Sequence, residues 1–241
     1  MADAAHEGRG RALMAARDGE PLADAAGGLF VASARRPERV DVALRALDLT
    51  IASVGLIVLS PLFVLATVVV GVGSGRPILY RGARVGRGGQ VFTMVKFRTL
   101  PLDAEQRFSK HLGSELSRLS ANEAGALGRV LRASQLDELP QLWNVLRGHM
   151  SIVGPRPIRP IFFEELTHEI PQYWQRLVVR PGLTGLAQLR MTREMSWQDK
   201  LSHDLEWIAD RCASLYLQVA LATAVRLVTR PLRQLAGRRR G

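Results

Sequence analysis

The chain has 241 residues, a formal net charge of +11, and a composition that is 47% hydrophobic but only 6% aromatic. This length is sufficient for one domain with a buried core. The charge requires an anionic counterpart, such as nucleic acid, an anionic membrane or a phosphorylated substrate. The aliphatic composition argues against a module that stacks on RNA bases. The single cysteine, Cys212, excludes an internal disulfide and a zinc site built from cysteines.

The N-terminal residues 1–38 are rich in Ala, Gly and Arg and show no sustained periodicity. This composition predicts a disordered tail. It does not predict a signal peptide, because acidic residues are interspersed and no apolar segment follows the first basic residues.

Residues 39–75 form the first structured segment, which we expect to enter a membrane. No charged residue lies between Asp48 and Arg76, so the apolar run exceeds the roughly 20 residues that a spanning helix requires. Ser60 and Pro61 lie near its middle, where proline removes a backbone hydrogen bond and bends a helix. Basic residues flank both ends, whereas a crossing helix shows an excess on its cytoplasmic side. We therefore favour a re-entrant helix hairpin, with a spanning helix as the alternative.

A catalytic domain is expected over residues 76–230. The glycine-rich passage 82–92 predicts a hairpin, and Val91–Phe97 alternates as a short strand does. The polar residues from 103 to about 126 predict an exposed helix. Residues 161–180 predict a mostly helical stretch broken at Pro171.

The C-terminal part predicts a helix that begins after a cap at Ser196, followed by an apolar segment and a basic tail over residues 231–241. The uncharged residues 213–225 are too few to span a bilayer. An apolar face with a basic edge indicates an amphipathic helix lying on anionic lipids. A core helix with a basic tail is the alternative. The whole pattern predicts a mixed α/β fold that is mostly helical.

The stretch 135–148 places two adjacent carboxylates, Asp137 and Glu138, beside a helix start. Ser134 stands three residues before Asp137, which resembles a capping box and makes a helix cap one interpretation. Pro140 is better placed as the first helical residue. The carboxylates would then lie just ahead of the helix, beside its exposed N–H groups.

Under this second interpretation, Asp137 keeps a low pKa and stays ionised, as a carboxylate nucleophile must. Adjacent carboxylates also hold Mg²⁺ well when substrate phosphates complete its coordination. Three arginines, Arg132, Arg156 and Arg180, would balance the negative charge, because arginine binds phosphate bidentately.

Several motifs, taken in order and spacing, carry a family resemblance. They are Arg45-x-x-Asp48 with Ser60-Pro61, Phe92-x-x-x-Lys96-Phe97-Arg98-Thr99 with Asp103-Ala104-Glu105, Leu136-Asp137-Glu138-Leu139-Pro140-Gln141-Leu142, Met150-Ser151-x-Val153-Gly154-Pro155-Arg156-Pro157, and Arg180-Pro181-Gly182-Leu183-Thr184-Gly185. From about Arg39 to Val228 the chain resembles the bacterial sugar transferases, specifically the minimal form of the monotopic phosphoglycosyl transferases.

This resemblance implies transfer of a sugar-1-phosphate from a UDP-sugar to polyprenyl (undecaprenyl) phosphate, with Mg²⁺ and with release of UMP. It implies that Asp137 attacks the β-phosphorus, forming a covalent phosphosugar-enzyme, and that Glu138 is its partner; Asp137 is also the expected metal ligand. Positions that the family uses for phosphate, nucleotide or metal contacts are matched by Lys96, Arg132, Arg156, Arg180 and Asp204.

The resemblance further implies a re-entrant hairpin and interfacial helices on the cytoplasmic face of a bacterial inner membrane. There the enzyme would catalyse the first membrane step of exopolysaccharide, lipopolysaccharide or other glycoconjugate assembly. The sugar, the pathway, the length of the polyprenol and the oligomeric state are not indicated, and a homodimer is one option.

Four residues depart from the family pattern. His149 stands where aspartate is usual, Leu100 replaces methionine, Trp207 replaces tyrosine, and Gln135 replaces serine. None belongs to the Asp-Glu pair, so the chain is not expected to be inactive. Two alternatives remain: a membrane-associated scaffold whose chemistry has decayed, and a nucleic-acid binder. Charge alone favours the latter, and the long apolar run argues against it.

Overall fold

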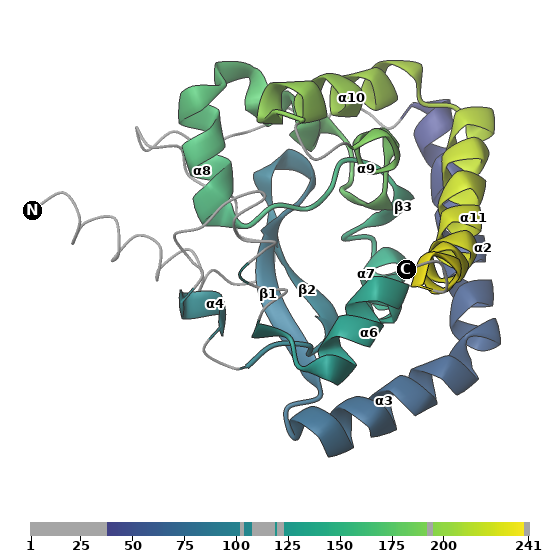
Figure 1. The fold of residues 1–241 in the computed structure, drawn as a ribbon. Helices are drawn as coiled ribbons and strands as arrows, with labels where there is room; N and C mark the ends of the chain where they lie inside the picture. Colours follow the sequence, from purple (N-terminus) through teal and green to yellow (C-terminus); the bar gives the residue numbers. More distant parts are fainter. Residues whose placement is uncertain (1–37, 102–103, 108–118, 120–122, 192–194, 239–241) are drawn as a thin grey trace, which may run out of the picture.

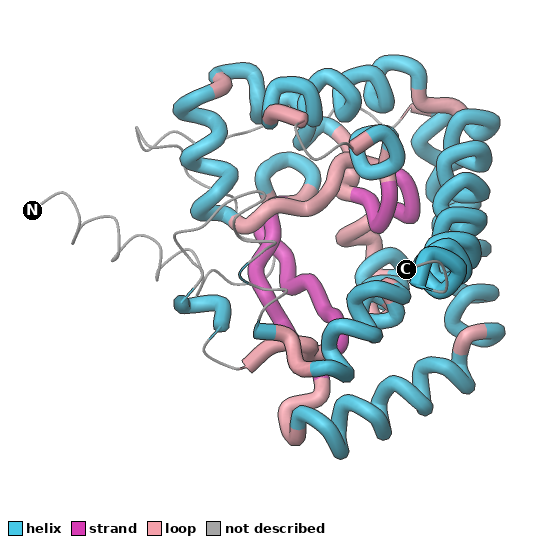
Figure 2. Tube along the Cα trace, in the orientation of Figure 1, coloured by secondary structure: helices cyan, strands magenta, loops and turns pink. Residues whose placement is uncertain are grey.

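The computed structural model describes residues 38–101, 104–107, 119, 123–191 and 195–238. Helices surround two small sheets in this part of the chain (Figure 2). The fold is thus mixed α/β and mostly helical, as the sequence predicts. The predicted N-terminal tail and most of the helix predicted over residues 103–126 lie outside the described residues.

The chain enters the fold through two apolar helices, α2 (Arg39–Val58) and α3 (Ser60–Ser74). Their axes are bent by 64° at Leu59. Pro61 lies in the first turn of α3, where its missing N–H costs nothing, and the Ser60 hydroxyl donates to the Ile57 carbonyl at 2.8 Å. The predicted helix break at Ser60 and Pro61 is confirmed.

In the described part of the chain, no helix taken singly combines the length and the apolar composition needed to cross a membrane. The bent pair α2–α3 meets both requirements only when its two members are counted together. The re-entrant path itself stays a prediction.

A buried carboxylate, Asp48, fastens α2 to the rest of the molecule. Its Oδ1 accepts hydrogen bonds at 2.8 Å from the Ser151 hydroxyl, the Ile152 N–H and the Tyr216 hydroxyl. Arg45, one turn earlier, donates to the carbonyls of Val145 and Leu146. These contacts satisfy polar groups that would otherwise be costly to bury, and they explain why an apolar helix carries Arg45 and Asp48.

The central hairpin consists of β1 (Leu79–Val85) and β2 (Val91–Phe97), joined by the turn η1 (Arg87–Gly89). The turn contains Gly88 at φ 67°, a conformation that glycine adopts without strain. The predicted hairpin and strand are confirmed. In Figure 1 the hairpin runs through the middle of the molecule, with α8 beside β1 and α7 beside β2.

The outer edge of β2 is covered by one side chain rather than by a third strand. The Asn144 amide donates to the Thr93 carbonyl at 2.7 Å, and its oxygen accepts from the Val95 N–H at 3.0 Å. Asn144 is buried on the short helix α7 (Gln141–Leu146). This contact fixes the strand that carries Lys96 against the helix that follows Asp137 and Glu138.

The remaining elements are mostly helical. They are α4 (Ala104–Arg107), α6 (Ala126–Ser134), η2 (Leu136–Glu138), β3 (Ser151–Val153), α8 (Pro160–Glu169), η3 (Pro171–Val178), β4 (Gly182–Thr184), α9 (Leu186–Arg190), α10 (Trp197–Asp210) and α11 (Ala213–Arg238). Strands β3 and β4 pair in parallel. The predicted break at Pro171 is confirmed. Ser196 caps α10, as expected, and the structure shows that it does so in a capping box with Asp199.

Helix α11 has two apolar faces. Tyr216 and Val219 are buried, whereas Leu217, Leu221 and Val225 are exposed at a spacing of four residues. One side of α11 therefore packs on the core, as a core helix would. Its other side presents an exposed apolar stripe, as an amphipathic helix lying on lipid would. The helix runs to Arg238 and so continues past residue 231, where the basic tail was expected to begin.

Candidate active site

Asp137 and Glu138 lie in the 3₁₀ turn η2, between α6 and α7. The capping-box interpretation of Ser134 is wrong. Ser134 is the last residue of α6, and its hydroxyl donates back to the carbonyls of Val130 and Leu131. The two carboxylates stand ahead of α7, as the alternative predicts. Pro140, predicted as the first helical residue, instead immediately precedes the helix, which begins at Gln141.

The turn into the carboxylate pair depends on Gln135, which has φ 57° and ψ 15°. This left-handed conformation is uncommon outside glycine and is found more often at functional sites. It ends α6 and redirects the chain so that Asp137 turns into the protein, where its side chain is buried.

Asp137 is only 5% exposed, and its burial sets its chemistry. Burial, together with the charge of Glu138, raises the pKa of Asp137 to about 6. The cations Lys96 and Arg132 act in the opposite direction. The expectation of a low pKa is therefore wrong, because desolvation outweighs the nearby positive charge. Asp137 is still mostly ionised at neutral pH.

Lys96 lies on β2, and Asp137 and Glu138 are among the charges that act on it. Burial and the neighbouring charge of Arg84 lower the pKa of Lys96 to about 8, although the two carboxylates partly offset this. Its ammonium group lies 5.0 Å from the ring centroid of Tyr80, the residue opposite it on β1. Lys96 is thus a partly buried cation facing the carboxylate pair.

Arg156 pairs directly with Glu138, at 3.0 Å between Nη2 and Oε1. The Glu138 charge raises the pKa of Arg156. Because the Arg156 side chain is 56% exposed, it can also reach a ligand. Its loop packs closely on the backbone where β4 begins. A Cβ on Gly154 would lie 2.6 Å from the Arg180 carbonyl oxygen, and a Cβ on Gly182, the first residue of β4, would collide with the Gly154 nitrogen.

Two predicted site residues make other contacts. The Arg180 Nε donates to the Gly148 carbonyl at 2.8 Å, beyond the C-terminal end of α7, whereas Glu138 precedes that helix. Burial and the charges of Arg45 and Arg87 lower the pKa of Arg180. Asp204 is buried in an ion pair with Arg176, at 2.8 Å.

The structure adds Arg84 to the cationic side of the site. It is buried on β1 and lies on the same face of the hairpin as Lys96, because Arg84 pairs with Phe92 and Tyr80 pairs with Lys96. Sequence reasoning missed Arg84. If the register of the predicted hairpin had been assumed, it would have placed Arg84 on the same face as Lys96.

The residues present are compatible with a bound Mg²⁺. In the described part of the chain, no three His, Cys, Asp or Glu side chains gather closely enough to hold a metal by themselves. Mg²⁺ is commonly bound by one or two carboxylates together with substrate phosphates and water. Asp137 and Glu138 supply two such carboxylates. His149 lies against Phe92, with ring centroids 5.6 Å apart.

The family model described as "Bacterial sugar transferase" matches residues 40–230. The chain belongs to this family. Among curated bacterial sugar transferases, it is 34% identical to the UDP-glucose:undecaprenyl-phosphate glucose-1-phosphate transferase of Caulobacter vibrioides, over 79% of this chain and 71% of that protein. It is 36% identical to the exopolysaccharide production protein ExoY of Sinorhizobium fredii, over 69% and 77%.

A third relative is longer. The UDP-N-acetylgalactosamine-undecaprenyl-phosphate N-acetylgalactosaminephosphotransferase of Aeromonas hydrophila is 33% identical over 73% of this chain, which spans only 41% of that protein. The similarity is therefore centred on the sugar transferase region shared by these proteins.

Proposed function

We propose that the protein transfers a sugar-1-phosphate from a UDP-sugar to undecaprenyl phosphate and releases UMP. The names of the Caulobacter and Aeromonas relatives support this substrate class. The observation that carries the proposal is the pairing of a buried Asp137 with Glu138, opposite Lys96, Arg132 and Arg156.

In the first step, an Asp137 carboxylate oxygen attacks the β-phosphorus of the donor. The bond from that phosphorus to the oxygen bridging the two phosphates breaks, and UMP leaves with the electron pair. The nearby cations, Lys96, Arg132 and Arg156, would stabilise the charge on the phosphoryl oxygens. With a pKa of about 6, Asp137 is available as a carboxylate at neutral pH.

In the second step, a phosphate oxygen of the acceptor lipid attacks the same phosphorus. The bond to Asp137 breaks, which restores the carboxylate and forms a lipid-linked diphosphosugar. Glu138 would assist by holding the Arg156 guanidinium beside the reacting phosphate. Asp137 and Glu138 would hold Mg²⁺ together with donor phosphates, and this ion would neutralise phosphate charge.

The two steps predict a donor-only reaction. Protein incubated with a UDP-sugar and Mg²⁺, without lipid, should release UMP in an amount equal to the enzyme and gain the mass of the phosphosugar. A panel of UDP-sugars would identify the donor. Asp137→Asn should lower turnover by at least about a thousandfold, since it removes the nucleophile.

The matched control is Asp199→Asn, an exposed carboxylate in the α10 cap, which should keep wild-type turnover. Turnover that depends on lipid and shows neither donor-only UMP nor a mass adduct would exclude the covalent mechanism. Full activity in Asp137→Asn would favour a different catalytic residue.

The proposed reaction takes place at a membrane, on the cytoplasmic face where nucleotide sugars are available. The apolar pair α2–α3 and the exposed stripe of α11 support membrane association. Anionic lipids suit the net charge of +11.

A further inference from the structure

One buried guanidinium, that of Arg176, connects three segments of the fold. Its Nη2 lies 2.8 Å from the Asp204 carboxylate on α10 and donates to the Arg156 carbonyl at 2.9 Å. Its Nη1 donates to the Tyr173 hydroxyl, also at 2.9 Å. Arg176 and Asp204 are 5% and 4% exposed, so this network is shielded from solvent.

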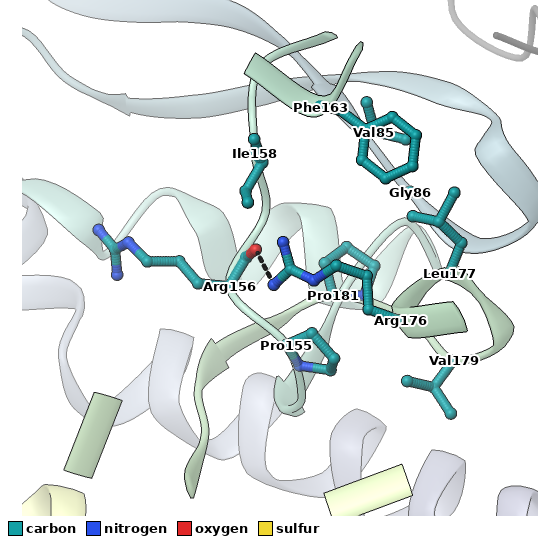
Figure 3. Close-up of a pocket in the computed structure, with 10 residues that line it drawn as sticks. All are labelled: Val85, Gly86, Pro155, Arg156, Ile158, Phe163, Arg176, Leu177, Val179 and Pro181. Atoms are coloured by element: carbon teal, nitrogen blue, oxygen red, sulfur yellow. Dashed lines mark hydrogen bonds between the residues drawn. The ribbon is translucent and has the colours of Figure 1, made fainter. Parts of the chain in front are cut away.

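The network holds the backbone of Arg156 but does not contact its guanidinium. Figure 3 shows the Arg156 carbonyl directed toward Arg176 and the Arg156 side chain extending away from it. That side chain reaches Glu138. Pro155 and Pro157 flank Arg156 and restrict the loop. The carbonyl contact therefore determines where the Arg156 guanidinium can reach.

The Arg176 guanidinium is closely packed, with only 5% of the residue exposed. The cavity that it borders has a volume of only about 10 Å³, and its walls include the apolar residues Val85, Ile158, Phe163 and Leu177. A space of this size holds at most about one water molecule. Arg176 thus acts on a ligand only through another residue.

We infer that Arg176 and Asp204 are positioning residues, a buried ion pair that sets the Arg156 backbone so that the Arg156 guanidinium meets the donor phosphate beside Glu138. Arginine suits this position because its planar fork can donate to several partners at once. Asp204 compensates its buried charge. The inference rests on the proposed function and gives Asp204 a role other than direct contact with the nucleotide.

A double-mutant cycle on donor-only UMP release tests this inference. Arg176→Lys keeps the charge next to Asp204 but loses the fork, and should lower the second-order rate constant of single-turnover UMP release about tenfold through misplacement of Arg156. Arg156→Ala should lower it about a hundredfold by removing the phosphate contact itself. The double variant should be no slower than Arg156→Ala, because Arg176 then has nothing left to position.

Two further variants complete the test. Asp204→Glu keeps the charge but shifts the Arg176 guanidinium, and should cause the same loss of rate as is expected for Arg176→Lys. It therefore keeps the inference testable if Arg176→Lys folds poorly. Arg190→Lys, in an exposed ion pair with Glu206, is the matched control and should retain the wild-type rate constant of single-turnover UMP release. Thermal unfolding of every variant separates loss of fold from loss of positioning.

The outcomes are distinct. Losses that multiply, giving about a thousandfold in the double variant, would mean independent roles and would overturn the inference while leaving the proposed function intact. A wild-type protein that releases no UMP from any UDP-sugar, with or without lipid, would overturn the proposed function, and the inference would fall with it.

Discussion

At the scale of single residues, Asp137 and Lys96 have pKa values shifted toward each other. Burial raises the pKa of Asp137 to about 6 and lowers that of Lys96 to about 8. In both cases desolvation disfavours the charged form. Between these values both groups are charged, which is the state that nucleophilic attack on a phosphate requires.

The pH dependence of the donor-only reaction should therefore be bell-shaped. Below about pH 6 the rate should fall as Asp137 gains a proton and loses its nucleophilic lone pair. Above about pH 8 it should fall as Lys96 loses its charge. The measurement is the second-order rate constant of single-turnover UMP release from pH 5 to 10 in the absence of lipid, so that the acceptor phosphate does not titrate.

Lys96→Arg serves as the control for the alkaline limb. A guanidinium stays protonated throughout this range, so the fall near pH 8 should disappear while the acid limb stays near pH 6. An alkaline limb that persists in Lys96→Arg would assign it to another group.

The order of residues around Asp137 was predictable, but its ionisation was not. The preference of proline for helix starts was enough to predict that the two adjacent carboxylates lie just ahead of a helix. The burial of Asp137 depends on the packing of strand β2 against η2, two segments that are distant in sequence. The buried pairing of Asp204 with Arg176 is equally non-local, because two helical segments must pack before it exists.

At the scale of elements, the site is held together by contacts between short segments. Strand β2, with Lys96, and helix α7, which follows Asp137 and Glu138, are joined by the Asn144 amide. This amide covers a strand edge that would otherwise be open. The hairpin and the helix breaks follow from local glycine and proline patterns and were predicted; the Asn144 contact has no local signal.

Asn144→Ala should destabilise the protein by about 2 kcal/mol, because it removes two hydrogen bonds at a buried position. For a chain of this size the midpoint of thermal unfolding should fall by about 4–8 °C. The measurement is thermal unfolding in detergent, followed by circular dichroism.

Ser202→Ala is the control for this measurement, since it removes an exposed hydroxyl that bonds within α10. Its free energy of unfolding should change by less than about 0.5 kcal/mol. Equal midpoints for Asn144→Ala and the wild type would show that the amide contact adds nothing to stability.

At the scale of the whole molecule, apolar side chains are exposed on the three helices α2, α3 and α11, which lie along the right-hand and lower edges of Figure 1. They include Val54, Ile57, Val64, Val68, Leu221 and Val225. Exposed apolar residues on neighbouring helices are typical of a surface that contacts a partner or a membrane. The apolar run of α2 and α3 and its break were predictable from the sequence. The hydrogen bonds by which Asp48 on α2 contacts β3 and α11 were not.

The contribution of α11 to membrane binding can be measured separately from that of α2 and α3. Leu221→Glu combined with Val225→Glu replaces two exposed apolar side chains on one stripe of α11. Losing their partial burial in lipid should cost about 2 kcal/mol, which is roughly a thirtyfold loss in partitioning. The measurement is a lipid titration with anionic vesicles, read by sedimentation.

Ser202→Glu combined with Ala209→Glu is the control, because it adds the same charge to exposed positions of α10. If both pairs of substitutions weaken binding equally, net charge alone draws the protein to the membrane and α11 does not contact lipid. If only the α11 pair weakens it, the stripe lies in the interface, and α11 together with α2 and α3 orients the Asp137 site relative to the bilayer.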